Sequence, residues 1–338
     1  MVKFGKRKKT VVAIAMIFVL GAASLFAACG KQGGSNKRLV LNEVAHSIFY
    51  APMYIALEKG YFEDEGLDVT LVTGFGADKT MTALLTGEAD IGFMGCESTI
   101  YTYKEGAKDY AVSFAQLTQR AGNFLVSREK EENFQWSDLK GKEILGGRAG
   151  GMPQMVFEYI LRKNGLDPKK DMSIDQSIDF GSTAAAFSGG KGQYTVEFEP
   201  HATLLEEKGD GYVVASLGED SGYVPYTSFS VRKSYLEENG DVILAFTKAL
   251  QKGMDEARTL SAEQIADIIS PQFDSTDKKV LTRIVDRYKQ QDTWKENLIF
   301  EKESFELLEN ILMDSGVLDE MVPYEDLVNT EFAKKVSK

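Results

Sequence analysis

The stretch from residue 38 to residue 76 constrains the fold more than any other part of the chain. Residues 38–44 read RLVLNEV and residues 67–73 read LDVTLVT, two apolar runs that suit buried strands. Between them Pro52 opens PMYIALEKGYF, a run that suits a helix because proline loses no hydrogen bond in the first helical turn. This order predicts a parallel β-α-β unit. In such sheets ligands bind beyond the carboxyl ends of the strands, where helix N-termini expose unpaired N–H groups.

Further strands and helices along the chain predict two α/β lobes. The first lobe is expected to continue with strands at 91–94 and 110–117, each preceded by a helix. The second lobe is expected to contain two helices, one ending near residue 163 and one at 183–187. Its apolar runs predict four strands, at 143–145, 173–178, 193–198 and 212–217.

The lobe boundaries follow from two expected crossings, at 118–123 and at 226–231. We therefore expect lobe 1 to comprise 38–121 plus 226–338, and lobe 2 to comprise 122–225. Helical periodicity from residue 236 onward predicts C-terminal helices that cap the first lobe. The segments 83–97 and 185–200 share one order of helix, glycine break, strand and acidic residue. This agreement predicts two similar halves, although two unrelated units can also agree by chance.

Residues 1–28 predict an export signal. Basic residues before residue 10 precede the almost wholly apolar run 11–28. The end of this run, LFAAC, resembles the bacterial lipoprotein signal, in which the cysteine, here Cys29, is lipidated and becomes the new N-terminus; Phe26 stands where leucine is usual. The alternative is an uncleaved anchor, since the run just reaches the length that spans a bilayer. Residues 29–37, with several Gly and Lys, predict a flexible tether to a folded domain.

The charge and the cysteines limit the partners and the source of stability. The formal charge of −12 includes five cationic residues of the predicted signal, so the mature chain carries −17. Such a charge argues against nucleic acid or an anionic membrane surface as a partner. The two cysteines are Cys29 and Cys96, and acylation of the first would leave no intrachain disulfide. Stability must then come from the core.

The sequence lacks catalytic motifs. The two histidines, His46 and His201, do not form HExxH, and two cysteines cannot make a structural zinc site. There is no G-x-S-x-G elbow or G-x-x-x-x-G-K-[ST] loop, and the glycines around Arg148 do not fit G-x-G-x-x-G. We therefore expect a protein that is not an enzyme and that holds no metal or cofactor.

Two segments carry a resemblance to a known family. APMYIALEKGYFEDEGLDVTLV at 51–72 and LLTGEADIGFMG at 84–95 resemble the solute-binding proteins of ABC importers for sulfonates, taurine, nitrate and thiamine pyrimidines. The similarity extends in order over most of the chain after residue 38, and it is specific for the family but not for the ligand. Some eukaryotic relatives synthesise the thiamine pyrimidine with a cysteine-rich signature. The nearest stretch here, Gly95-Cys96-Glu97, lacks that signature.

The resemblance implies a periplasmic-binding-protein-like fold of type II, with two three-layer α/β lobes joined by a hinge and C-terminal helices on the first lobe. It implies capture of a small extracellular solute, sulfonate-like or thiamine-pyrimidine-like, and its delivery to an ABC permease and its ATPase. The protein is expected to be a monomer, lipid-anchored on the extracytoplasmic face of the cell membrane. Two alternatives use the same fold: an extracytoplasmic lipoprotein enzyme, and a receptor subunit that reports the ligand without transport.

The candidate ligand-binding residues come mainly from the turns that follow the predicted strands, including the turn at 180–183. The helix N-termini at Met152 and Ser182, with Arg148, suit an anion such as a sulfonate or carboxylate. Glu199 matches a family position that lines the cleft, and with aromatic faces it suits an aromatic amine. The full set is Phe49, Tyr50, Phe75, Gly95, Cys96, Glu97, Arg148, Gly150, Gly151, Met152, Ser182, Glu199, His201 and Tyr226.

Several candidates also fit structural roles. Phe49 and its neighbour at position 50 can pack beneath the helix. Arg148 can be an exposed loop charge, and Cys96 can be a small buried residue. Glu199 and His201 also suit ordinary positions at the start of a helix.

Overall fold

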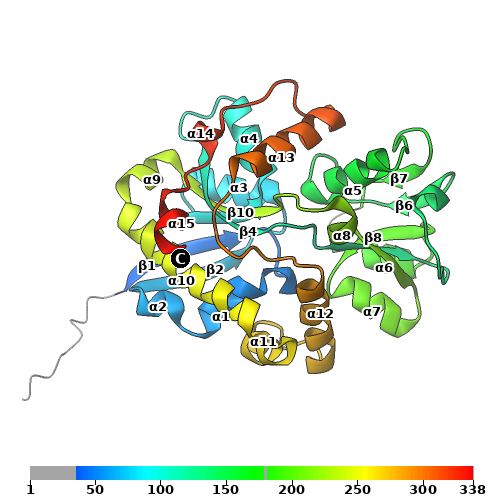
Figure 1. Cartoon of the computed structure of the whole chain (residues 1–338), viewed down its shortest axis with the longest axis horizontal. Helices are drawn as coiled ribbons and strands as arrows, with labels where there is room; N and C mark the ends of the chain where they lie inside the picture. Colours follow the sequence, from blue (N-terminus) through cyan, green and yellow to red (C-terminus); the bar gives the residue numbers. More distant parts are fainter. Residues whose placement is uncertain (1–35, 179–180, 338) are drawn as a thin grey trace, which may run out of the picture. The chain divides into compact units, whose positions relative to one another are not determined.

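The described residues form two five-stranded sheets with the same strand plan (Figure 1). The computed structural model describes residues 36–178 and 181–337. The strands of the first sheet are, in order, β2 (Leu67–Thr73), β1 (Lys37–Glu43), β3 (Ile91–Gly95), β10 (Thr227–Arg232) and β4 (Ala111–Thr118). Those of the second are β7 (Ser173–Asp175), β6 (Glu143–Leu145), β8 (Tyr194–Phe198), β5 (Asn123–Ser127) and β9 (Tyr212–Ser216).

The fourth strand of each sheet arrives from the other sheet. β5 directly follows the crossing out of the first sheet, and it runs antiparallel to β8 and β9. β10 follows the crossing back, and it runs antiparallel to β3 and β4. A strand that enters from the neighbouring lobe starts at the edge where the parallel strands end. The crossings therefore place the first residue of β5, Asn123, beside the carboxyl end of β8, and the first residue of β10, Thr227, beside that of β3.

The predicted parallel β-α-β unit is confirmed. β1 pairs in parallel with β2, from Lys37 opposite Leu67 to Glu43 opposite Thr73. A single 3₁₀ turn, η1 (Ile48–Tyr50), leads into α1 (Ala51–Glu58), which has Pro52 in its first turn. α2 (Tyr61–Asp64) completes the connection. Local sequence signals thus specify the unit that positions the first wall of the site.

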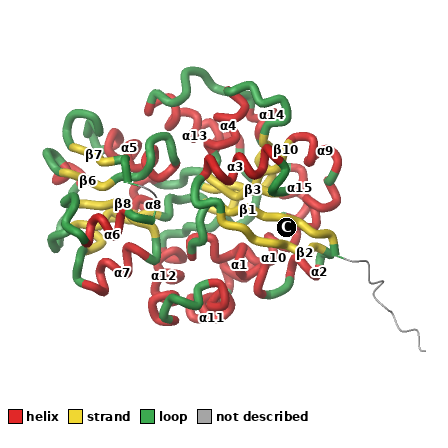
Figure 2. The backbone as a smooth tube through the Cα atoms, turned by 180° about the vertical axis from the view of Figure 1, so that it is seen from behind, coloured by secondary structure: helices red, strands yellow, loops and turns green. Residues whose placement is uncertain are grey.

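Helices lie on both faces of each sheet, so that each lobe has three layers (Figure 2). The first sheet carries α1, α2, α3 (Ala77–Thr86), α4 (Glu97–Lys104), α9 (Lys233–Glu238), α10 (Gly240–Thr259) and α15 (Glu331–Val336). The second sheet carries η2 (Trp136–Leu139), α5 (Met152–Lys163), α6 (Thr183–Ser188), α7 (His201–Lys208) and α8 (Leu217–Ser221).

The C-terminal helices pack mainly on the first lobe. α10 packs on α1 and α2, and α11 (Ala262–Ile269) packs on α1 and on α12 (Lys278–Gln290). α12 also donates side-chain hydrogen bonds to α7 of the second lobe, and α13 (Lys302–Ser315) contacts α5. η3 (Ser270–Gln272) and α14 (Tyr324–Leu327) complete this part. The predicted cap on the first lobe therefore also reaches the second lobe.

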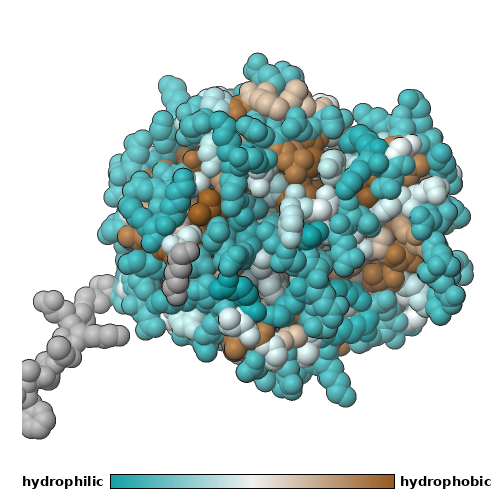
Figure 3. Space-filling model, in the orientation of Figure 1, coloured by the Kyte–Doolittle hydropathy of each residue, from teal (hydrophilic) through white to brown (hydrophobic). Residues whose placement is uncertain are grey.

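Aromatic packing fills the core of the first lobe. Phe93 of β3 stacks on Phe229 of β10 with ring centroids 4.1 Å apart, and Phe246 of α10 meets Phe229 at 5.3 Å. On the face shown in Figure 3, apolar residues form separate patches among hydrophilic ones. Among the helices of the described residues, none is long and apolar enough to cross a membrane. The predicted signal, Cys29 and Phe180 of the 180–183 turn lie outside the described residues.

Candidate functional site

A cavity of about 520 Å³ lies between the two lobes, at the carboxyl ends of the parallel strands. The first lobe lines it with residues that follow β1, β2 and β3, and the second with residues that follow β6 and with the end of β8. The starts of the two crossing strands contribute Asn123 and Thr227. This volume falls within the range of small-molecule sites. The cavity is thus built where the sequence predicted it, by loops from both lobes.

Most of the predicted site residues line this cavity. Tyr50 enters it from the end of η1, and Tyr226 enters it from the crossing back into the first sheet. The Tyr226 hydroxyl donates to Oδ1 of Asn123 at 2.8 Å, which fixes the two crossing segments to one another. The predicted residues on the cavity wall are Tyr50, Gly95, Glu97, Arg148, Gly150, Gly151, Met152, His201 and Tyr226.

Phe49, Phe75, Cys96 and Ser182 do not line the cavity. Phe49 is fully buried, with its ring 5.6 Å from that of Tyr226 and 5.4 Å from that of Tyr288, because η1 turns successive side chains in different directions. Phe75 is 67% exposed. Cys96 is buried within the fold, where burial raises the pKa of its thiol. Ser182 is the exposed N-cap residue of α6, without a side-chain capping bond.

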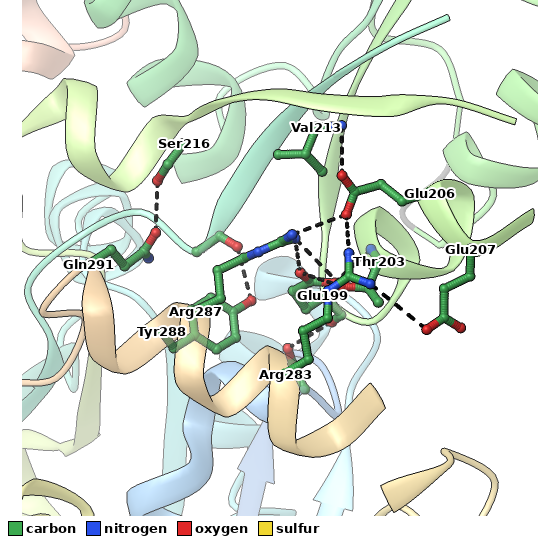
Figure 4. A network of polar contacts seen from close by, with 12 residues as sticks. Glu199, Thr203, Glu206, Glu207, Val213, Ser216, Arg283, Arg287, Tyr288 and Gln291 are labelled. Atoms are coloured by element: carbon green, nitrogen blue, oxygen red, sulfur yellow. Dashed lines mark hydrogen bonds and ion pairs between the residues drawn. The ribbon is translucent and has the colours of Figure 1, made fainter. Parts of the chain in front are cut away.

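Glu199 belongs to an ion-pair network away from the cavity (Figure 4). Its carboxylate accepts hydrogen bonds from the N–H and hydroxyl of Thr203, both at 2.9 Å, and from Nη1 of Arg287 at 2.6 Å. Nη2 of Arg287 lies 3.0 Å from Oε2 of Glu206, which also pairs with Arg283. Glu199 thus links the second lobe to α12, because it follows the end of β8 at a point where its carboxylate reaches Arg287 of that helix.

Arg148 lies at an interlobe contact and is half-exposed. Its Nη1 is 3.2 Å from Oδ1 of Asp78, which stands in the first turn of α3 on the opposite lobe. Such exposed pairs contribute little to stability. A second interlobe contact is shorter: the hydroxyl of Tyr101 donates a hydrogen bond to the carbonyl of Gly150 at 2.9 Å. Gly150 has φ of +76°, a conformation that favours glycine.

Glu97 places a buried carboxyl on the cavity wall. The residue is 2% exposed and begins α4, directly after the end of β3. Its carboxyl folds back over Gly95, where an added Cβ would meet Oε2 at 2.1 Å, so a larger residue there would have to displace this carboxyl. Burial raises the pKa of Glu97 to about 8, although the N–H of Met152, at the start of α5, opposes the shift. Oε2 has no hydrogen-bond partner within residues 36–178 and 181–337.

Glu197 supplies a second buried carboxyl, which the sequence reasoning missed. It lies on β8, is 2% exposed, and lines the cavity from the second lobe. Its Oε1 accepts a hydrogen bond from the hydroxyl of Thr195 at 2.6 Å, and the hydroxyl of Thr183 also bonds to the carboxyl. Burial nevertheless raises the pKa of Glu197 to about 7. An acidic residue inside the otherwise uncharged run YTVEF was the signal available in the sequence.

His201 completes the ionisable groups predicted for the site. It begins α7 and lines the cavity. Burial lowers the pKa of its imidazole, so the ring is neutral at pH 7. It therefore offers a hydrogen bond to a ligand without adding a charge.

Comparisons with known proteins agree with this architecture. A model of the NMT1/THI5 like family matches residues 48–260. The chain is 48% identical over 324 residues to "Putative binding protein YtlA" of Bacillus subtilis, covering 96% of both chains. It is 24% identical over 338 residues to a "Putative aliphatic sulfonates-binding protein" of Bacillus subtilis, covering 97% of this chain and 96% of that protein. Among solved structures, the alkanesulfonate-binding protein SsuA from Xanthomonas axonopodis pv. citri bound to MOPS is similar with a TM-score of 0.71 at 16% identity, covering 88% of this chain and 99% of that chain.

Proposed function

This chain belongs to the NMT1/THI5-like family, and from that premise we propose that it is the solute-binding component of an ABC importer. It captures a small organic solute outside the cytoplasm and delivers it to the permease, rather than converting it. The observation that carries the proposal is the cavity of about 520 Å³, which is lined by both lobes at the carboxyl ends of their strands. A solute in that position contacts both halves of the protein at once.

The proposed mechanism is a hinge equilibrium between open and closed lobes. A solute that contacts both lobes binds the closed form better, so it shifts the population toward that form. We propose the crossings at 119–123 and 222–226 as hinges, which corresponds to lobe 1 at 38–121 plus 226–338 and lobe 2 at 122–225. The two crossings run side by side, because the N–H of Val224 donates to the carbonyl of Gln119 at 2.8 Å. Side-by-side crossings favour one shared hinge.

A solute screen on the domain from residue 37 onward tests this function. Sulfonates, aromatic acids, amines, amidines, pyrimidines and flavins are added singly, and the melting temperature is measured. A bound solute stabilises the folded state by about 2.7 kcal/mol at a hundredfold excess over Kd. Small-angle scattering with the best solute should show a smaller radius of gyration than without it. A panel without any stabilising solute would contradict the function, and an unchanged radius at saturation would contradict the hinge.

We further propose that Cys29 carries a lipid, which holds a monomeric domain at the membrane beside its permease. With an alkyne-labelled fatty acid supplied to cells, Cys29→Ser should abolish labelling while leaving the fold of the domain intact. Cys96→Ser is the matched control and should retain the label, because Cys96 is buried inside the fold. Label that persists in Cys29→Ser would refute the anchor.

A further inference from the structure

Acidic side chains outnumber basic ones on the cavity wall. Among the described residues that line it, one guanidinium, that of Arg148, faces four carboxyl groups, and it already pairs with one of them, Asp78, at 3.2 Å. His201 adds no charge, because burial lowers its pKa. The four carboxyl groups belong to Asp78, Glu97, Glu105 and Glu197.

The helix N-terminus best placed to receive an anion already faces a carboxyl group. α5 begins at Met152, whose backbone N–H donates a hydrogen bond to the carboxyl of Glu97 on the opposite lobe. A sulfonate or carboxylate brought to this N-terminus would therefore meet the carboxyl of Glu97. An anionic solute and an ionised Glu97 exclude each other at close range.

Glu97 lacks a protein partner that would neutralise it. Its side chain is almost fully buried. Among the described residues, Oε2 accepts no hydrogen bond and no cationic side chain forms an ion pair with the carboxyl. A buried carboxyl with a free oxygen is costly unless something supplies donors or positive charge. The cavity that Glu97 lines is where such a group can enter.

Glu197 repeats this situation on the second lobe. Its hydrogen-bond donors are the hydroxyl groups of Thr195 and Thr183, and neither carries a charge. The two carboxyl groups therefore line one cavity from opposite lobes, each without a cationic partner among the described residues. A solute with a positive charge would contact both lobes through these groups.

We propose that the solute is a small organic cation, with a protonated amine or an amidine group held by Glu97 and Glu197. This assignment rests on the proposed function and narrows its solute class. The walls contributed by Met81, Tyr50, Tyr101 and Tyr226 suit an organic body, and tyrosine faces also attract a cation. A bare metal ion would gain nothing from these apolar and aromatic surfaces.

The test uses probes that share one body and differ in charge. Benzamidine, benzamide and benzoate form one set, and butylamine, butanol and butane-1-sulfonate form the other. Isothermal titration of the wild-type domain should show the cation of a set binding at least tenfold more tightly than its neutral and anionic counterparts. Glu97→Gln and Glu197→Gln should each raise the Kd of that cation by at least tenfold, which is the effect of removing one charge-assisted hydrogen bond. Glu309→Gln is the control, because it changes a buried carboxyl on α13 outside the cavity.

Proton release gives a second readout. The carboxyl groups bind the cation in their ionised form, so binding should release protons at pH 7 and affinity should rise from pH 6 to pH 8.5. Titrations in buffers with different ionisation enthalpies count the protons. The other ionisable groups on the wall are Asp78, Glu105, Arg148, His201, Tyr50, Tyr101 and Tyr226. Glu309→Gln, outside the cavity, is again the control and should leave the proton count unchanged.

The outcomes separate this inference from the proposed function. Tight binding of a benzoate or sulfonate that survives Glu97→Gln would overturn the cation assignment and leave solute binding intact. Cation binding that neither Glu97→Gln nor Glu197→Gln weakens would overturn it as well. If no member of these sets or of the wider solute panel binds, the proposed function fails together with the inference.

Discussion

Replacing Arg287 with methionine is expected to lower the free energy of unfolding by about 3–5 kcal/mol at pH 7.5, the cost of removing one partner of a buried ion pair. Nη1 of Arg287 lies 2.6 Å from Glu199, whose side chain is 0% exposed. In the variant, the N–H and hydroxyl of Thr203 would be the donors left to that carboxylate. Methionine keeps much of the aliphatic packing of the arginine side chain, so the decrease in the free energy of unfolding measures mainly the loss of the guanidinium charge. Urea unfolding followed by circular dichroism measures it.

The loss in the Arg287 variant should shrink on acidification. Burial raises the pKa of Glu199, and Arg287 opposes that shift. Without Arg287 the pKa rises further, and a group whose pKa is raised by folding stabilises at low pH and loses that stability as pH rises. We therefore expect a smaller difference from the wild type at pH 5 than at pH 7.5. The double variant Arg287→Met/Glu199→Gln should recover much of the loss, because no buried charge is then left unpaired.

Arg283→Met is the matched control for this experiment. Arg283 lies one turn earlier on α12, and its side chain is 44% exposed where it pairs with Glu206. Exposed pairs of this kind contribute up to about 1 kcal/mol. Equal losses in the Arg283 and Arg287 variants would show that the network stabilises through packing and not through the buried charge of Glu199.

Replacing Glu97 with glutamine is expected to raise the stability of the solute-free protein above pH 8. Folding raises the pKa of Glu97 from 4.5 to about 8, so the folded state binds more protons between these values and loses stability as pH rises. At 1.36 kcal/mol per pKa unit, the full cost of ionising this carboxyl in the fold is about 5 kcal/mol. Glutamine has nearly the same shape and does not ionise, so the cost disappears.

The pH profile distinguishes this explanation from a general improvement in packing. Glu97→Gln should match the wild type at pH 4.5 and exceed it progressively up to pH 9, as measured by urea unfolding. Glu105→Gln is the control, because Glu105 also lines the cavity but is exposed, and its profile should follow the wild type. A constant offset between Glu97→Gln and the wild type at all pH values would contradict titration of a buried carboxyl as the cause.

Stability and solute binding are therefore expected to oppose one another at this residue. The substitution Glu97→Gln, which should stabilise the solute-free protein, should also weaken binding of the proposed cation, because the cation would contact the ionised carboxyl. Sites that bind ligands commonly carry such unfavourable groups. In this reading, the energy that the buried Glu97 costs the empty protein favours binding of its solute.

The sequence alone determined the elements and the order of their connections. The strands β2 and β6 begin and end at the predicted residues, Leu67–Thr73 and Glu143–Leu145. The chain passes from one sheet to the other between β4 and β5 and again before β10, whereas the sequence placed the second passage at 226–231, on β10 itself; the lobe bounds stay a prediction. These features depend on apolar periodicity and on local proline and glycine signals, which act over a few residues and can be read without the fold.

Tertiary structure decided which acidic side chain faces the cavity. Glu197 and Glu199 are two residues apart, and the sequence favoured Glu199 by resemblance. Glu197 still lies on β8 and lines the cavity, whereas Glu199 follows the end of the strand and pairs with Arg287, 88 residues further along the chain. No local pattern specifies that partner. A buried carboxylate is stabilised only where the fold places a cationic side chain beside it. Arg287 of α12 pairs with Glu199, and within the described residues no cationic side chain pairs with Glu197.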